Sequence, residues 1–227
     1  MSALLRTRLL PALVAAGLVA PAGALGEPSP GGAQAPAGDV VLTSGAHAYR
    51  DRPARVRGFV PPADAGRSVR IERLDEATGA WTPVASALAL ADGRFTARWR
   101  SQRAGRFMLR AVIDAGGDAQ TASAPAALAV TVYERSKATW YGPGLYGRRT
   151  AGQRLTRRLA GVAHRTLPCG TLVALHHRGQ ATVVEVVDRG PFGTDAEWDL
   201  TAATAAAVGF TQTGTLGVLP RAGSGKP

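Results

Sequence analysis

The sequence contains little cysteine and little histidine, and each scarcity excludes a class of chemistry. Cys169 is the one cysteine among 227 residues, so a disulfide within the chain is excluded. The four histidines lack partners at the spacing of a zinc site, and we expect neither a metal nor a cofactor. The stability of the protein must therefore come from packed apolar cores.

Acidic residues are also few, 16 against 27 lysines and arginines, which gives a formal net charge of +11. An excess of this sign favours polyanionic partners such as nucleic acid, anionic lipid or acidic wall polymers. Nearly all the basic residues are arginine and alanine is abundant, as a GC-rich genome would produce. The net charge alone therefore does not select a partner.

The apolar run near the start is too short to span a membrane. Arg6 and Arg8 precede an apolar stretch at residues 9–20, and small residues follow at 22–24, the pattern of a secretory signal peptide. We expect cleavage of residues 1–24, an exported protein without a stable membrane anchor, and no nucleic-acid partner. An uncleaved anchor is the alternative. No cysteine follows the run, which excludes a lipid anchor of the lipobox kind.

Residues 25–39 are rich in proline, glycine and alanine without periodicity, which predicts a flexible linker. Residues 40–133 then show short alternating segments separated by turn residues; Phe95, Ala97 and Trp99 share one face of such a segment. The expected strands are 40–43, 54–59, 68–73, 81–85, 94–100, 106–113 and 127–133. This pattern resembles an immunoglobulin-like β-sandwich of bacterial surface proteins, and we expect a spacer or accessory binding module.

Residues 138–219 contain four segments in a specific order. They read ATWYGPGLYGRRTAGQRL, VAHRTLPCGT, VVEVVDRGPF and EWDLTAATAAAVGF. The order resembles the double-psi β-barrel domain of the rare lipoprotein A family and, more distantly, of expansins, which act on cell-wall polysaccharide. The resemblance implies an all-β chain in which the sandwich is followed by a six-stranded double-psi barrel with one short helix.

Local sequence patterns predict the strands and the helix of this second unit. Strands are expected at 138–141, 162–164, 171–176, 181–187 and 214–218, and a helix at 201–208 that ends before Gly209. Residues 134–137 would form a short joint between the two units, and residues 220–227 a loose tail.

Two aspartates are the candidates for cutting a glycan, which requires a carboxylic acid and a carboxylate. In a lytic transglycosylase the sugar's own hydroxyl attacks, so one residue can serve as acid and then as base. Asp188 ends an apolar strand before a Gly-Pro turn; an Asx turn or a pair with Arg189 is its alternative role. Asp199 precedes the helix and could be its N-cap, although Thr201 can do that equally well. If the two aspartates converge, each raises the other's pKa.

The resemblance implies further site residues. His164 matches a family site histidine and is the third catalytic candidate; a core position is its alternative. The candidates for substrate binding are Gln153, Arg189 and Trp198, together with Tyr141 and Tyr146. The two tyrosines lie with Trp140 in an aromatic and glycine-rich loop suited to stacking on sugar rings, and core packing is an equal alternative for Trp140.

Gln153 stands where wall-cleaving relatives have a glutamate, and glutamine cannot donate an acidic proton. Cys169 likewise lacks the cysteine partner found in many relatives with glutamine at this position.

Three functions remain open. Loss of a general acid costs about 10²–10⁴-fold in rate, so the missing glutamate favours a wall protein that binds and remodels peptidoglycan or a related wall polysaccharide without efficient cleavage. The alternative is a peptidoglycan lytic transglycosylase that uses Asp199 and Asp188 as acid and base. A protein-binding module is the third.

Overall fold

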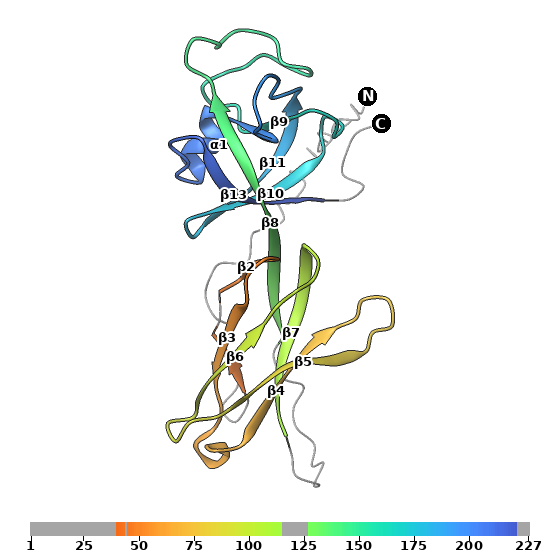
Figure 1. Ribbon diagram of the computed structural model, residues 1–227, viewed down its shortest axis with the longest axis vertical. Coiled ribbons are helices and arrows are strands. Elements are labelled where there is room, and N and C mark those ends of the chain that lie inside the picture. The colour runs from red at the N-terminus through yellow and green to blue at the C-terminus, as the bar shows by residue number, and fades with distance from the viewer. Residues whose placement is uncertain (1–39, 44, 115–126, 222–227) are drawn as a thin grey trace, which may run out of the picture. The chain divides into compact units, whose positions relative to one another are not determined.

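A computed structural model describes residues 40–43, 45–114 and 127–221 (Figure 1). The signal peptide predicted at 1–24, the linker at 25–39 and the tail beyond residue 221 lie outside these described residues. Among the described residues, no helix combines the length and the apolar character required to cross a membrane.

The first part of the described chain forms two β-sheets (Figure 1). One sheet has the order β1-β3-β6 and contains β1 (Val41–Leu42), β3 (Ala54–Phe59) and β6 (Arg94–Trp99). The other has the order β5-β4-β7-β8 and contains β4 (Ser68–Leu74), β5 (Trp81–Leu88), β7 (Gly105–Ile113) and the start of β8 (Leu128–Tyr141). The short β2 (His47–Tyr49) pairs parallel with β8, and a 3₁₀ turn, η1 (Pro62–Asp64), precedes β4.

The two sheets share one apolar core. Val56 and Phe95 from the first sheet lie in the same buried cluster as Ile71, Leu109 and Val132 from the second. Inward residues alternate with exposed ones along β3 and β6, as expected for strands with one face in a core. The arrangement is a β-sandwich; its immunoglobulin-like connectivity stays a prediction.

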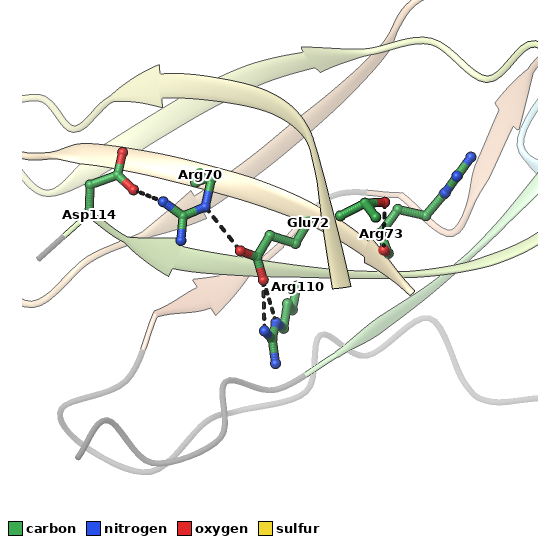
Figure 2. Close-up of polar contacts among 6 residues, drawn as sticks. Arg70, Glu72, Arg73, Arg110 and Asp114 are labelled. Carbon is green, nitrogen blue, oxygen red and sulfur yellow. Dashed lines mark hydrogen bonds and ion pairs between the residues drawn. The ribbon is translucent and has the colours of Figure 1, made fainter. Parts of the chain in front are cut away.

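Charged side chains on β4 and β7 are paired with one another (Figure 2). Arg70 Nε and Arg110 Nε donate to the two carboxylate oxygens of Glu72 at 2.9 and 2.8 Å, and Arg70 also pairs with Asp114. Burial opposes ionisation of Glu72, but these two hydrogen bonds lower its pKa overall. Arg110 also stacks on Trp81, with 4.3 Å between guanidinium and ring centroid. These charges therefore have structural partners.

Strand β8 continues without a break into the second unit. After pairing with β7 it pairs with β13 (Gly214–Pro220), from Glu134↔Val218 to Ala138↔Gly214. The residues of the predicted joint, 134–137, are therefore strand. They contain no glycine or proline to interrupt it, and buried Ser136 keeps the alternation of exposed and buried side chains.

Six strands close the second unit into a barrel. Besides β8 and β13 they are β9 (Val162–His164), β10 (Leu172–His177), β11 (Gln180–Asp188) and β12 (Trp198–Thr201). Their order is β12-β9-β11-β10-β13-β8, and the pairing of β12 with β8 closes the circle. The six-stranded barrel expected from the resemblance is confirmed. Pro220 ends β13 and Arg221 N donates to Leu172 O at 2.8 Å, so the first two residues of the predicted loose tail are fixed.

The single helix of the barrel, α1 (Ala202–Ala207), begins as the sequence predicts. Thr201 is its N-cap, and its side chain accepts a hydrogen bond from Thr204 N at 3.4 Å. Gly209 follows the helix with φ of +61°, a conformation that favours glycine. Because Thr201 caps the helix, Asp199 is released from that role.

Candidate active site

A row of side chains crosses four neighbouring strands of the barrel. Asp188 on β11 pairs with Ala163 on β9, Ala163 with Asp199 on β12, and Asp199 with Thr139 on β8. Directly paired residues project to the same face of a sheet. Two strand spacings separate the two aspartates, which places their Cα atoms about 10 Å apart. The fold therefore brings Asp188 and Asp199 to one surface of the barrel.

A β-bulge in β11 turns Asp188 towards this surface. Val186 pairs with Val162, but Asp188 pairs with the next residue of β9, Ala163, so Val187 is an extra residue. In a regular strand Asp188 would share the face of Val186, which lies in the buried core. The inserted residue reverses that parity and moves the carboxylate from the core face to the outer face.

The row forms the floor of a cavity of about 510 Å³, within the usual size range of ligand pockets. Thr139, Ala163, Asp188 and Asp199 all line it. Its wall contains Tyr141 together with three exposed cations and two exposed aromatic rings: Arg148, Arg149, Arg189, Trp140 and Phe192. Both candidate acids therefore open into one cavity that is lined by polar and apolar side chains.

The environment of Asp199 raises the pKa of its carboxyl. Burial raises its pKa, the hydrogen bond from Thr139 Oγ1 to Oδ1 at 2.7 Å lowers it, and the charge of Asp188 raises it; the net direction is upward. A raised pKa is what a general acid requires near neutral pH.

Asp188 is anchored by backbone donors. Its Oδ1 accepts the N–H of Arg189 at 2.8 Å and the N–H of Ala151 at 3.0 Å. The first bond comes from the adjacent residue and is not the Asx turn that the sequence offered as an alternative, which would use the N–H two residues on. It orients the carboxylate without removing it from the cavity.

Tyr141 supplies a buried hydroxyl next to the two acids. It lies two positions after Thr139 on β8, hence on the same face, and lines the cavity. Among the described residues its Oη has no hydrogen-bond partner. Burial raises the pKa of Tyr141, and the charges of Asp188 and then Asp199 raise it further, so the group is a neutral donor. Tyr146 does not line the cavity; its ring lies 5.2 Å from the Arg157 guanidinium.

His164 and Trp198 lie on the opposite face from the acids. Each is the chain neighbour of a cavity residue, Ala163 or Asp199, so strand alternation turns it inward. Trp198 is 2% exposed and belongs to the barrel core, and its ring centroid lies 4.4 Å from that of His164. Neither residue lines the cavity. The roles predicted for them, catalysis for His164 and substrate contact for Trp198, are therefore not supported by their positions.

The contacts of His164 indicate a structural role. Its Nδ1 accepts the backbone N–H groups of Thr166 at 3.2 Å and Leu167 at 3.0 Å. Burial lowers its pKa, although Glu197, 3.7 Å from Nε2, opposes this shift. The neutral ring thus holds the turn that follows β9.

We predict that His164→Ala destabilises the barrel by about 1–3 kcal/mol, because two backbone donors lose their acceptor. His164→Asn offers an amide oxygen in place of Nδ1 and should recover part of that loss. Thermal unfolding of the three proteins measures the difference. A stable His164→Ala barrel that had lost all activity would contradict the structural role.

Gln153 also lies outside the cavity. It is exposed at the end of a turn in which Thr150 N donates to Gln153 O at 2.7 Å. The same turn presents the Ala151 N–H to Asp188. The loop that departs from the family pattern thus contributes a backbone donor to the site.

Among the cavity residues discussed above, Thr139 and Phe192 were not singled out by the sequence reasoning, although a signal for Phe192 existed. The available signal was a bulky aromatic directly after Asp-Arg-Gly-Pro, at the end of an apolar strand.

Comparison with known proteins gives matches over the barrel. Residues 133–219 match a family model described as "Lytic transglycolase". The chain is 48% identical over 80 residues to "Probable endolytic peptidoglycan transglycosylase RlpA" of Synechocystis, which covers 34% of this chain and 25% of that protein. It is 39% identical over 87 residues to the protein of that name from Aquifex aeolicus, covering 37% and 38%.

A third relative, "Endolytic peptidoglycan transglycosylase RlpA" of Pseudomonas aeruginosa, is 40% identical over 82 residues, covering 34% of this chain and 24% of that protein. The chain thus spans between 24% and 38% of the length of these relatives. Among solved structures, a "Biofilm associated protein - BSP domain" aligns with a TM-score of 0.28 and 12% identity, covering 82% of this chain and 27% of that one.

Proposed function

We propose that this chain cleaves the glycan strands of peptidoglycan as a lytic transglycosylase, because residues 133–219 belong to the rare lipoprotein A-like family of double-psi β-barrels. The observation that supports cleavage is the row that brings Asp188 and Asp199 into one cavity. Such a substrate places the protein in the cell envelope. The β-sandwich remains a spacer or accessory module in this proposal.

In the proposed reaction Asp199 is the acid. It donates its proton to the glycosidic oxygen as the bond from that oxygen to C1 of the muramic sugar breaks. The C6 hydroxyl of the same sugar then forms a new bond to C1, and its proton passes to a carboxylate. Asp199, now ionised, can accept that proton, and the charge of Asp188 stabilises the cationic character that develops at C1. No water is consumed, and the product carries a 1,6-anhydro ring.

The remaining cavity residues have supporting roles. The Tyr141 hydroxyl, a neutral donor, would bind a sugar oxygen beside the acids. Arg189 is held by a bond from Nη1 to Leu167 O at 2.5 Å, and it gives the cavity wall positive charge. That charge suits the carboxylates carried by peptidoglycan.

The sequence alone ranked binding without efficient cleavage first, because Gln153 replaces a glutamate. The names of the relatives fit the cleaving alternative better. Gln153 also lies outside the cavity, so Asp199 and Asp188 would have to suffice for the acid chemistry. Binding without cleavage remains the second candidate, and the missing carboxylate at position 153 is the observation that favours it.

Digestion of purified sacculi in oxygen-18 water separates these candidates. The proposal predicts released fragments with 1,6-anhydro ends and no oxygen-18 at the new end. Incorporation of oxygen-18 would indicate hydrolysis instead. Sedimentation with sacculi and no released fragment would favour the binding module.

Cleavage should depend on pH through Asp199. Its active form is protonated, so activity should be present below the raised pKa of Asp199 and be lost as the pH rises through it. Thr139→Val removes the hydrogen bond that lowers this pKa, and should therefore move the alkaline limb to higher pH. Rates of fragment release across the pH range measure the shift; a limb that stays in place would contradict the assignment.

A further inference from the structure

The exposure of the Phe192 side chain at the cavity requires an explanation. Its side chain is 72% exposed, and Trp140, across the same cavity, is 38% exposed. Within the described part of the barrel these are the large hydrophobic side chains left open to this extent. A single exposed apolar residue is ordinary. Two aromatic rings on the edge of a cavity that contains two carboxylates suggest a ligand with both apolar and polar surfaces.

The backbone holds Phe192 in a fixed place beside Asp188. Gly190 has φ of +118°, a conformation that side chains other than hydrogen rarely allow, and Pro191 next to it is buried. The Phe192 ring packs over Gly190, 3.5 Å from the point where a Cβ would lie. Asp188, which begins this turn, is itself anchored by two backbone donors. The ring therefore lies against the turn that carries the carboxylate.

Phe192 lies four residues after Asp188, which ends β11, and both residues line the cavity. The acid row runs from Asp188 on β11 through β9 to Asp199 on β12 and Thr139 on β8. Phe192 therefore belongs to the Asp188 end of the row. Trp140 pairs with Leu200 of the core, so it reaches the cavity edge from the opposite face of β8.

We propose that Phe192 is a stacking platform for a sugar ring on the Asp188 side of the bond to be cleaved, so that the glycan lies across β11, β9, β12 and β8. The proposal rests on the proposed function for the choice of glycan. The glycosidic oxygen lies between the two carboxyls.

A pyranose ring matches this combination of groups. Its axial C–H bonds form an apolar face that packs on an aromatic ring, and its hydroxyls point outward in the plane of the sugar. Asp188 and Arg189, four and three residues before Phe192, also line the cavity and can bind those hydroxyls. A purely apolar ligand would instead bury these charges without partners, at considerable cost.

Binding of Phe192 variants to purified sacculi tests the platform. Asp199→Asn serves as the parent, so that the sacculi are not consumed during cosedimentation. Phe192→Ala should weaken binding about tenfold. Phe192→Tyr keeps the ring and should bind as the parent does. Phe59→Ala is the matched control, because Phe59 is 43% exposed but lies in the sandwich, and it should leave binding unchanged.

The outcomes separate this inference from the proposed function. Parent-like binding by Phe192→Ala would overturn the platform even if the unmodified chain cleaves sacculi. Ring-dependent binding without any cleavage would leave the platform standing and refute the transglycosylase. If even the parent did not bind sacculi, both would be refuted. Unchanged thermal unfolding of Phe192→Ala checks that the loss is not a folding defect.

Discussion

Asp199→Asn should reduce the release of 1,6-anhydro fragments from sacculi by at least about 10²–10⁴-fold, the usual contribution of a general acid. Asparagine keeps the shape of the side chain and can still accept the hydrogen bond from Thr139 Oγ1, but it has no acidic proton to give. Binding to sacculi should persist, because the aromatic and arginine side chains of the cavity are untouched.

Asp195→Asn is the matched control for this substitution. Asp195 lies four residues away, with its side chain 77% exposed, and pairs with Lys137 at 2.5 Å on the surface. Its replacement should leave the rate unchanged, since exposed ion pairs contribute little to stability. Equal rates for the Asp199→Asn protein and the unmodified chain would show that another group supplies the proton.

Trp198→Ala should destabilise the barrel by about 3–5 kcal/mol, the usual cost of removing a large aromatic side chain from a core. Trp198 is 2% exposed and packs among the apolar side chains of the barrel cluster, so its removal leaves a cavity that neighbours cannot fill. The loss should appear as a lower midpoint in thermal or denaturant unfolding. The sequence had suggested instead that this ring contacts substrate.

Trp140→Ala provides the comparison within the same barrel. Trp140 is 38% exposed at the cavity edge, and its Nε1 donates one bond of 3.3 Å to Thr211 O. Its removal should cost far less stability than that of Trp198, about 1 kcal/mol for the lost hydrogen bond, and should weaken glycan binding. A stable Trp198→Ala protein that no longer binds glycan would reverse these two assignments.

Sequence patterns were sufficient for most of the strands. The alternation of Phe95, Ala97 and Trp99 predicted β6 closely, because each inward residue lies in the sandwich core. Strand β2 has three residues and β12 has four, too few for a period of two to stand out. The uninterrupted run of β8 through residues 134–137 was not predicted, since these residues were assigned to a joint between the two units.

The sequence predicted some residues of the candidate site correctly but not how they come together. The order of the motifs identified Asp188 and Asp199, but their convergence depends on strand pairing and on the bulge at Val187, which no local pattern indicates. His164 and Trp198 were expected to point into the site, but their side chains face the other side of the sheet. Each adjoins a residue of the acid row, and adjacent residues of a strand face opposite ways. If β12 had been recognised as a strand, Trp198 and Asp199 would have been predicted to face opposite sides of the sheet.

Titration of the Asp199 carboxyl by carbon-13 NMR tests most directly whether the two aspartates act as one site. Asp199 should titrate above the ordinary range of aspartate, and its pKa should fall in Asp188→Asn, because removal of that charge removes one of the causes of the shift. An ordinary pKa for Asp199, unchanged by Asp188→Asn, would contradict the shared site and the acid role built on it.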